Sequence, residues 1–403
     1  MVNFTILAGG FAGFVATYNF DSEAGSLSLL GQSTTGENPS WIALHPQNRS
    51  ILYAVNELVP DGQLQSFTVE SNGSLSLVDT VATGGVGPTF TDVLSTGEVS
   101  AMNFGSPNAS FVATDPNDPS RFLKDSPVLS FPAEVGKSNP HMSLEHNGEI
   151  FVPDLGADKI WRVVNDGAPG KFKVQGQIDI DAGAGPRHIA IQDDILFTIH
   201  EKTSTLTAQR IPTAPNGTTF PLIANVSIVP SNPLNGTKFA AAELLISKPT
   251  EKFPNPLIYV SNRNIGETID PEGDTIAVFE FTNGTSADTN STAATANTVA
   301  KTIFGTPAKR MVRRSKWARQ AEEAEAEGAG EGALTLLAQV PTGLQQIRSM
   351  ALGRVEDSGD EFIIAGANTQ GGVAVFQRVD GGKNLTLVVR NEEIANRTSF
   401  VFL

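Results

Sequence analysis

One short, strand-like stretch occurs seven times along this chain, and it limits the fold more than any other feature. The copy at Ile195–Glu201 reads Ile-Leu-Phe-Thr-Ile-His-Glu, an apolar run typical of a buried strand that ends on a carboxylate. The other six copies are Phe4–Gly10, Ile51–Glu57, Val99–Gly105, Glu149–Leu155, Leu257–Arg263 and Phe362–Asn368. Successive copies begin 47, 48, 50, 46, 62 and 105 residues apart. A repeat of about 50 residues is one four-stranded propeller blade. The spacing therefore predicts an all-β, seven-bladed β-propeller.

The first complete repeat has the four strands that such a blade needs. Strand a is expected at Trp41–His45, strand b at Ile51–Glu57, strand c at Leu64–Val69 and strand d at Ser74–Val78. An Asn-Gly turn precedes strand d, as in a β-hairpin. Each blade is therefore predicted to hold four antiparallel strands.

The chain begins on a strand b, so its first blade lacks a preceding strand a. The C-terminal segment, which includes Ser399–Leu403, is expected to supply that strand and to remove an exposed sheet edge. We therefore predict one domain over residues 1–403, with the ring closed by the chain termini.

Two stretches interrupt the repeat. Residues 212–235 are rich in Pro, Asn and Thr, and we expect them to form a surface insertion. Residues 283–332 run from a Thr/Ala/Asn-rich tract through paired basic residues into a series of glutamates. Such low-complexity, block-charged sequence predicts a disordered insertion, because it cannot bury enough apolar surface. Proteolytic processing at the basic pairs, or docking of a partner there, is the functional alternative.

Composition limits the partners. The net charge of −15 opposes binding to nucleic acid or to an anionic membrane surface, and no apolar run reaches the length of a membrane-spanning helix. The absence of cysteine excludes disulfides, thiolate nucleophiles and cysteine-ligated metals. A small-molecule partner is favoured, and we expect a monomer.

Asn-x-Ser/Thr sequons occur more often than the composition predicts. The asparagines are Asn3, Asn48, Asn72, Asn108, Asn216, Asn225, Asn235, Asn283, Asn290, Asn384 and Asn396. Their density predicts a secreted glycoprotein. The chain shows no leader, so a signal peptide would be absent from this sequence. The alternative is a cytoplasmic protein whose turns are rich in Asn-Gly-Ser/Thr.

Strand direction predicts which side chains share one mouth of the propeller. In an antiparallel blade the d-to-a and b-to-c loops emerge on the same face, so residues that open strand a meet residues that close strand b. The first set is Trp41, His141, Arg187, His188 and Arg348. The second set is Asn56, Glu57, Asn103, Asp154, His200, Glu201, Asn262, Arg263 and Asn368.

Four of these residues are the strongest candidates for function. His141, Arg187, Glu201 and Arg263 place charge or a titratable ring on apolar inner strands, where it is costly unless something compensates it. A bound carboxylate would compensate the arginines.

For the other residues a structural role competes with a functional one. Asn56, Asn103 and Asn368 are typical turn caps. Glu57 and Asp154 fit substrate binding and pairing between blades equally well. His188 directly follows Arg187 and should point to the other side of its strand, as a core or inter-blade histidine. His45 is expected at the opposite face.

Motifs for other chemistries are absent. The sequence has no glycine-rich phosphate loop before a helix, no His-Glu-x-x-His and no Gly-x-Ser-x-Gly. No spacing is specific for a metal, so we expect neither metal nor cofactor.

Several segments closely resemble a known family. They are Asn38–His45, Leu52–Glu57, Pro140–His141, Phe151–Lys159, Gly185–Ala190 and Ile258–Arg263. They resemble the seven-bladed propeller lactonases, which contain carboxy-cis,cis-muconate cyclase and the propeller type of 6-phosphogluconolactonase. The sequon density resembles secreted fungal cyclase-like proteins.

This resemblance implies an active site of His141, Arg187, Glu201 and Arg263. Glu57, Asp154 and Arg348, which strand direction places at the same mouth, are further substrate-binding candidates. The implied reaction is lactone formation or opening on a small carboxylated substrate. Arg187 and Arg263 would bind carboxylates, and His141 or Glu201 would move the proton. The chain departs from the family pattern at Gln346–Ser349, where relatives have Pro-Arg, and at His200–Thr203, which reads His-Glu-Lys-Thr where relatives favour Asn-Glu-Leu. Two alternatives stay open, namely a sugar-lactone hydrolase and a non-catalytic secreted glycoprotein that binds a ligand or host surface.

Overall fold

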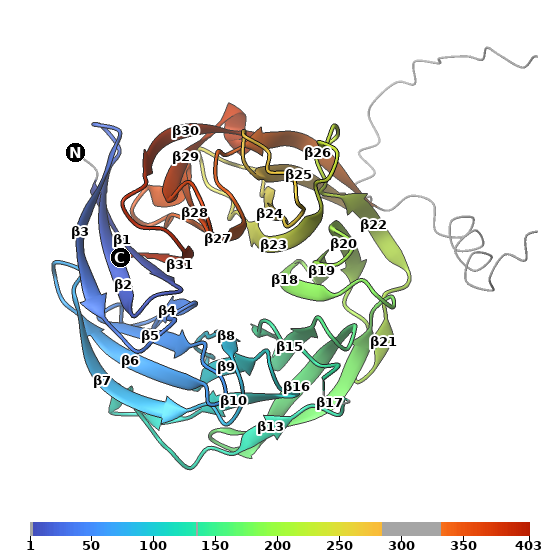
Figure 1. Ribbon diagram of the computed structural model, residues 1–403. Coiled ribbons are helices and arrows are strands. Elements are labelled where there is room, and N and C mark those ends of the chain that lie inside the picture. The colour runs from blue at the N-terminus through green and yellow to red at the C-terminus, as the bar shows by residue number, and fades with distance from the viewer. Residues whose placement is uncertain (1–2, 134–135, 284–331) are drawn as a thin grey trace, which may run out of the picture.

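Seven four-stranded antiparallel units surround a central opening (Figure 1). The computed structural model describes residues 3–133, 136–283 and 332–403. Within these ranges the only helical elements are two short 3-10 helices, η1 (Gly359–Glu361) and η2 (Asp380–Gly382). The predicted all-β, seven-bladed propeller is therefore confirmed.

Each blade has an innermost strand beside the central opening, followed by three strands toward its outer edge. In that order, blade 1 contains β31 (Arg397–Phe402), β1 (Asn3–Gly10), β2 (Phe14–Asp21) and β3 (Ser26–Thr34). Blade 2 contains β4 (Ile42–Leu44), β5 (Ile51–Asn56), β6 (Gln63–Val69) and β7 (Leu75–Ala82). Blade 3 contains β8 (Pro88–Phe90), β9 (Val99–Asn103), β10 (Asn108–Val112) and β13 (Val128–Ser130), with a separate hairpin of β11 (Thr114–Asp115) and β12 (Asp118–Phe122). Blade 4 contains β14 (Leu144–His146), β15 (Glu149–Asp154), β16 (Lys159–Ala168) and β17 (Lys171–Asp179).

The remaining blades follow the same order. Blade 5 contains β18 (Pro186–Gln192), β19 (Ile195–His200), β20 (Thr205–Arg210) and β22 (Leu222–Ser227). Blade 6 contains β23 (Phe239–Ile246), β24 (Ile258–Asn264), β25 (Thr275–Asn283) and β26 (Gly332–Pro341). Blade 7 contains β27 (Ile347–Leu352), β28 (Phe362–Ala367), β29 (Val373–Val379) and β30 (Asn384–Asn391).

Each of the seven repeated stretches forms the second strand from the inside of its blade. Every residue of β5, β9, β19, β24 and β28 is buried. A strand that is covered on both faces favours a continuous apolar run rather than alternation. This burial explains why the repeat is visible in the sequence at these strands and not at the outer ones.

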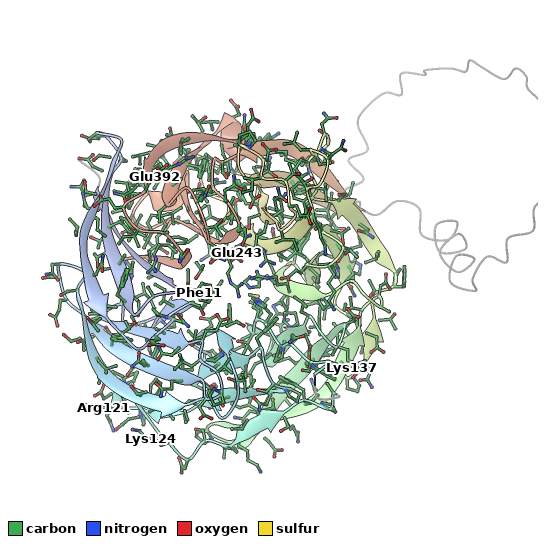
Figure 2. All side chains as sticks on the ribbon, in the orientation of Figure 1. Phe11, Arg121, Lys124, Lys137, Glu243 and Glu392 are labelled. Carbon is green, nitrogen blue, oxygen red and sulfur yellow. The ribbon has the colours of Figure 1, made fainter. Side chains whose placement is uncertain are left out.

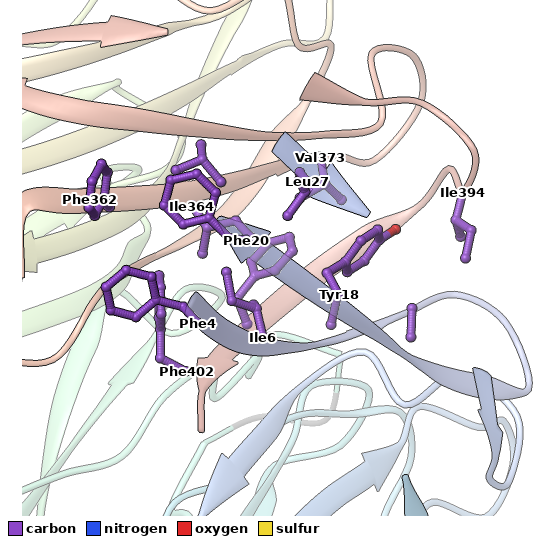
Figure 3. Close-up of a cluster of buried hydrophobic side chains, with 14 residues drawn as sticks. Phe4, Ile6, Tyr18, Phe20, Leu27, Phe362, Ile364, Val373, Ile394 and Phe402 are labelled. Atoms are coloured by element: carbon purple, nitrogen blue, oxygen red, sulfur yellow. The ribbon is translucent and has the colours of Figure 1, made fainter. Parts of the chain in front are cut away.

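The two ends of the chain close the ring as predicted. The C-terminal strand β31 pairs antiparallel with β1, for example Ile6 with Phe402, and so forms the innermost strand of blade 1. Apolar side chains of blades 1 and 7 then pack together (Figure 3). The rings of Phe20 and Phe362 meet edge to face with their centroids 4.9 Å apart, and Phe4 lies 5.9 Å from each. Closure therefore rests on strand pairing and on a shared aromatic cluster.

The prediction for residues 212–235 was wrong in part. This stretch contains β22, the outer strand of blade 5, and β21 (Gly217–Thr218), which pairs parallel with β17 of blade 4. The burial of β22 is only partial, because an outer strand packs on one side. Its apolar pattern is therefore too weak to distinguish it from a surface loop.

The low-complexity segment cannot be compared with its prediction, because residues 284–331 lie outside the described residues. Its flanks are ordinary hairpin strands, since Asn283 pairs with Gly332 across β25 and β26.

Most sequon asparagines lie at the surface. Of the ten that fall in the described ranges, eight are exposed, and Asn108 and Asn396 are half-buried. Asn290 lies outside these ranges. No helix in the described part of the chain is long and apolar enough to cross a membrane.

Candidate active site

The inner strands of several blades bulge at the same end, and these bulges direct polar side chains into the site. The register shifts between Pro186 and His188 in β18, between Ile347 and Ser349 in β27, and between Ala241 and Leu244 in β23. Each shift adds one residue, namely Arg187 in β18, Arg348 in β27 and one of the pair Ala242–Glu243, which lies opposite Ser261, in β23. A bulge leaves its extra residue outside the ladder and re-aims side chains. Three neighbouring blades thus present charged residues at one mouth.

In blade 5, a turn that contains Gly185 brings Glu201, which follows β19, close to Arg187 in β18. The backbone N–H of Glu201 donates to the carbonyl of Gly185 (2.7 Å), which fixes Glu201 beside the Pro186–Arg187 segment. Gly185 has φ +68°, a left-handed conformation that other residues adopt with strain. Its N–H donates to the carboxylate of Asp158 (2.8 Å), which belongs to the Phe151–Lys159 segment. Two of the sequence segments on which the resemblance rests are therefore in direct contact.

Glu201 lies between two arginines. Its Oε2 is 2.8 Å from Nε of Arg187 and 2.7 Å from Nη2 of Arg263. Arg187 is fully buried, whereas a quarter of the Glu201 side chain is exposed. Burial acts to raise the pKa of Glu201, but the surrounding arginines outweigh it and hold this pKa below its usual value. Glu201 is therefore a stable carboxylate, and both contacts fall on one oxygen, so Oε1 is left for a further hydrogen bond.

The arginines keep unused hydrogen-bond donors. Nη1 of Arg187 donates to the carbonyl of Ala242, and Nη2 of Arg263 lies 3.3 Å from the carbonyl of Ala241. Nη2 of Arg187 and Nε of Arg263 are buried and have no hydrogen-bond partner, and Nε of Arg187 contacts Glu201 as an ion pair without hydrogen-bond geometry. Burial lowers the pKa of Arg187 to about 9, and the charge of Arg263 adds to this effect while Glu201 opposes it. Buried donors without partners call for an explanation, and a ligand oxygen supplies one.

His141, His188 and Glu243 form a second chain of contacts, which links blades 4, 5 and 6. Nδ1 of His188 is 2.7 Å from Oε1 of Glu243, and Nε2 of His188 is 3.2 Å from Nδ1 of His141. All three residues are at most 4% exposed. Burial lowers the pKa of His141 well below its usual value, and the neighbouring arginines and His188 add to this effect. His141 is therefore a neutral imidazole at neutral pH.

His188 is the inter-blade histidine that the sequence predicted, but it also contacts a candidate catalytic residue, which the sequence did not predict. Strand alternation from Arg187 would turn His188 away from the mouth. The bulge at Arg187 breaks that alternation. Glu243 was also missed. Glu243 lies at the register shift within β23, one place after the position equivalent to Arg187 and Arg348, and its charge in the otherwise apolar run of β23 was the signal that could have identified it.

Aromatic rings surround the histidine pair. The ring of Trp41 lies 5.3 Å from His188 and 4.9 Å from Phe90, and the ring of Phe104 lies 5.6 Å from His141. These apolar faces exclude water from the imidazoles, which is the physical origin of their lowered pKa values.

Glu57 and Arg348 complete the charged mouth. Burial raises the pKa of Glu57, and the charge of Arg348 opposes this increase. The guanidinium of Arg348 lies 5.4 Å from the ring centre of Phe11. Figure 2 labels Phe11 and Glu243 at the inner side of the ring, around the central opening. The electrostatic coupling of Arg348 to both Glu57 and Glu201 connects this pair to the arginine cluster.

Asp154 is the one predicted substrate-binding residue that lies apart from this cluster. Its Oδ1 accepts the backbone N–H groups of Asn139 (2.7 Å), Gly156 (3.2 Å) and Ala157 (3.0 Å). Its Oδ2 accepts Oγ–H of Ser138 (2.5 Å) and Nε1–H of Trp161 (2.9 Å). The residue is fully buried. This hydrogen-bonding capacity is used within blade 4, so the geometry gives Asp154 a structural role.

The amides at this mouth bind the loops that lead in from the preceding blades, and the remaining histidine is tied to its own blade. Nδ2 of Asn56 donates to Glu37, that of Asn103 to Thr83 and that of Asn262 to Ile228. Nε2 of His200 contacts Oγ1 of Thr207 (3.0 Å), and burial lowers the pKa of His200 to about 4. The backbone N–H of Asn368 donates to the carbonyl of Gln346.

A cavity of about 500 Å³ lies at the other end of the inner strands, where Leu44, Leu352 and Phe402 line it. His45 lies there as predicted and accepts two backbone N–H groups on Nδ1. The charged groups of this end pair with one another, as Arg354 does with Asp357 (3.0 Å). We therefore place the site by its charged cluster and not by cavity volume.

Nothing in the described ranges suggests a metal centre, because no three His, Asp or Glu side chains there gather closely enough to hold an ion.

Comparison with known proteins agrees with the fold and the segments described above. The profile of the family "Lactonase, 7-bladed beta-propeller" matches residues 5–312. The chain belongs to this lactonase family. The chain is similar to a protein of Arthroderma benhamiae named "Probable 6-phosphogluconolactonase", at 27% identity over 268 residues. That match covers 63% of this chain and 65% of the relative.

Solved structures show the same fold at low sequence identity. The periplasmic gluconolactonase of Pseudomonas aeruginosa superimposes with a TM-score of 0.73 at 16% identity, over 100% of this chain and 99% of that one. A protein from Lactobacillus plantarum gives a TM-score of 0.73 at 18% identity, over 100% and 99% of the two chains. At these identities the likeness concerns the fold alone.

Proposed function

We propose that this lactonase-family protein hydrolyses the lactone of a small anionic sugar acid, of the 6-phosphogluconolactone type, at the charged mouth of the propeller. The observation that supports this proposal most strongly is the carboxylate of Glu201 held between Arg187 and Arg263, with a neutral His141 nearby. Family membership and the name of the Arthroderma benhamiae relative point in the same direction.

The protonation states favour hydrolysis over ring closure. Hydrolysis needs a base that takes a proton from water, and a neutral imidazole is such a base. Ring closure of a muconate needs an acid that gives a proton to carbon. His141 and Glu201 both have lowered pKa values, so at neutral pH they are unprotonated and have no proton to give.

The proposed reaction proceeds in two steps. First, water adds its oxygen to the lactone carbonyl carbon while His141 takes one of its protons. The guanidinium groups of Arg187 and Arg263 stabilise the negative charge that develops on the carbonyl oxygen. Then the bond from this carbon to the ring oxygen breaks, and the imidazolium gives its proton to that oxygen. The product is the open hydroxy acid.

The charge balance favours an anionic substrate. Three arginines face the mouth. Glu201 is the carboxyl group that interacts electrostatically with all three, and its pKa is lowered. Glu57 holds its proton to higher pH than usual, so it offsets less of the positive charge. Arg348 stands beside the other two arginines and is suited to bind a phosphate or carboxylate of the substrate.

Glu57 also supports a second candidate, the carboxymuconate cyclase reaction. A cyclase needs a proton donor next to the carbon α to a carboxylate, and the raised pKa of Glu57 makes it the acidic group most suited to that role. In this alternative Glu57 donates the proton, and the arginines hold the carboxylates of the substrate.

One substrate comparison separates these functions. We would assay the full chain with 6-phosphogluconolactone, with unphosphorylated gluconolactone and with 3-carboxy-cis,cis-muconate, alongside Arg187→Ala. We expect the fastest turnover with the phosphorylated lactone and its loss in the variant. Turnover of only the muconate would establish the cyclase instead. No turnover of any of the three would indicate the non-catalytic binding protein.

We also propose that the protein is secreted and glycosylated, which the exposure of eight sequon asparagines supports. Expression through a secretory host should give a mass that falls after treatment with an N-glycosidase. An unchanged mass would favour the cytoplasmic alternative.

A further inference from the structure

The base in the proposed reaction has two ring nitrogens, and the proposed function does not say which one acts. A neutral imidazole carries its proton on one nitrogen and a basic lone pair on the other. The partner of the first nitrogen sets which nitrogen that is. In this protein the partner of Nδ1 of His141 is Nε2 of His188, at 3.2 Å.

Glu243 decides the proton position of His188. A carboxylate only accepts hydrogen bonds, so the contact of 2.7 Å between Oε1 of Glu243 and Nδ1 of His188 requires the proton on Nδ1 of His188. Since burial lowers the pKa of His188, its other nitrogen carries no proton. Nε2 of His188 is therefore an acceptor, and Nδ1 of His141 must donate to it. This leaves the lone pair of His141 on Nε2.

The backbone fixes Glu243, the partner of His188. The N–H of Leu244 donates to Oε1 of Glu243 (3.0 Å), and the N–H of Glu243 donates to Oγ of Ser261 (3.0 Å). Glu243 and His188 also both stand at bulges of their inner strands. The backbone of blades 5 and 6 therefore fixes the direction of the hydrogen bonds that run from His141 through His188 to Glu243.

Among the described residues, Nδ1 of His141 has a hydrogen-bond partner and Nε2 has none. Nε2 is also not one of the fully buried polar atoms that lack a partner, although His141 as a whole is only 2% exposed. Oε2 of Glu243, by contrast, is sealed and has no hydrogen-bond partner. The open end of the chain of contacts is therefore His141 and the closed end is Glu243.

We propose that His188 and Glu243 are positioning residues that hold His141 in the tautomer with its proton on Nδ1, so that Nε2 is the nitrogen that takes the proton from water. The role of Nε2 of His141 as the base rests on the proposed lactone hydrolysis, whereas the tautomer of His141 is independent of that function. Glu243 has a second effect, because its negative charge, transmitted through His188, favours the imidazolium that forms on His141 among three arginines.

Nitrogen NMR tests the tautomer without any substrate. The chain has five histidines, so selective ¹⁵N-histidine labelling of the full-length protein gives few signals, which single substitutions assign. We expect His141 to carry its proton on Nδ1 at about pH 7.5. In His188→Leu the acceptor is lost, and we expect a mixture of both tautomers. In His188→Gln the amide oxygen can replace Nε2 as acceptor, and the Nδ1–H form should return.

Kinetics test the catalytic consequence. We expect kcat of His188→Leu to fall about 10- to 100-fold, less than complete loss of a general base, with little change in KM. His188→Gln should recover most of this loss. His45→Asn is the matched control, because His45 is a buried histidine at the opposite end of the inner strands, and it should leave kcat and the His141 signals unchanged.

Glu243→Gln separates position from charge. The amide oxygen can keep the contacts of Oε1, so the His141 tautomer should stay while kcat falls, because the imidazolium loses its counter-charge. This variant also serves if His188→Leu does not fold.

A proton on Nε2 of His141 in the wild type, or a tautomer that His188→Leu does not change, would overturn the proposal. An unchanged kcat in a folded His188→Leu would overturn its catalytic part. If the wild type hydrolyses no lactone, the proposed function fails, and the NMR result still decides the tautomer.

Discussion

The ends of β15 and β19 occupy the same position in neighbouring blades, and each carries a carboxylate that the sequence marked as a candidate. Asp154 at the end of β15 is fully buried and accepts five hydrogen bonds from neutral N–H and O–H groups. Glu201 directly after β19 is a quarter exposed and contacts two guanidinium groups through one oxygen. The hydrogen-bonding capacity of Asp154 is filled by groups of blade 4, whereas Glu201 can accept a further hydrogen bond.

Asp154 aligns with His200, one place before the position of Glu201, so both carboxylates stand where a repeated strand ends. Their difference shows what decides the role of a carboxylate there. Position in the repeat determines where the side chain emerges, and the donors around it determine whether it can act on a ligand. Neutral donors that fill every lone pair hold a loop together. Cationic donors keep the carboxylate ionised and bring their own charge to the mouth.

Removing a cation at the Glu201 end should have the largest effect on turnover. In Arg187→Met we expect kcat/KM for the preferred lactone to fall about 10²- to 10³-fold, because the developing oxyanion loses a charged donor. The fold should persist, because Glu201 keeps Arg263. Steady-state kinetics and a melting curve check both statements.

Arg162→Met is the control for that variant. Arg162 is also a buried arginine with a carboxylate partner, Glu149 at 2.5 Å, but it lies on β16 away from the mouth. The Arg162→Met variant should be less stable than the wild type and should keep the wild-type kcat. A comparable loss of kcat in both variants would show that any buried arginine matters equally and would break the comparison.

Removing the carboxylate at the Asp154 end should affect stability instead. In Asp154→Ala five donors lose their acceptor, among them the buried Nε1–H of Trp161. We expect the free energy of unfolding to fall by about 3 kcal/mol or more. Denaturant unfolding measures this change. The kcat of the folded fraction should stay within about twofold of wild type, and a loss of kcat without a loss of stability would contradict the structural role of Asp154.

The pH dependence reports the charge states at the Glu201 end. Activity requires neutral His141, whose pKa lies well below 6.5, and ionised Glu201, whose pKa is also lowered. At about pH 5.5 an imidazole with the usual pKa would be about nine-tenths protonated, and activity would be mostly lost. We therefore expect kcat/KM to stay nearly level from about pH 7.5 to about 5.5 and to fall only at lower pH. A midpoint of the acid limb near 6.5 would contradict the lowered pKa of His141.

Arg348→Met should have the smallest effect. Arg348 is half-buried at the rim and couples to Glu57 and Glu201, whereas Arg187 and Arg263 contact Glu201 directly. We expect KM for the phosphorylated lactone to rise about tenfold, the size of one charge-assisted contact, with kcat nearly unchanged. The unphosphorylated lactone should show a smaller change. Equal changes for both substrates would remove Arg348 from anion recognition.

Much of the fold could be predicted because its strongest signal is periodic. The strands β5 and β19 are buried on both sides, so their apolar runs stand out at a spacing of one blade. The outer strand β22 escaped detection, because an outer strand packs on one face and sits within a Pro- and Asn-rich stretch.

The candidate site could be predicted for residues at the ends of strands, where the order of the strands alone determines the face, even for Arg187 at a bulge. Arg187, Glu201 and Arg263 lie together because loops of antiparallel strands emerge on one face. Glu243 and the contact of His188 with His141 depend on bulges, and a bulge changes which side a residue faces without any fixed sequence mark. Asp154 was ambiguous for another reason, since most of its donors come from local loops that the sequence does not position.

The most direct test compares the two carboxylates in one assay. We would measure kcat for hydrolysis of 6-phosphogluconolactone by Glu201→Gln and by Asp154→Asn, each normalised to folded protein. The expected result is a loss of about 10²-fold or more for Glu201→Gln, because Arg187 and Arg263 lose the charge that holds them together at the reacting group, and a value within about threefold of wild type for Asp154→Asn. Full activity in Glu201→Gln, or an equal loss in both variants, would contradict the assignment of the active site to the Glu201 end.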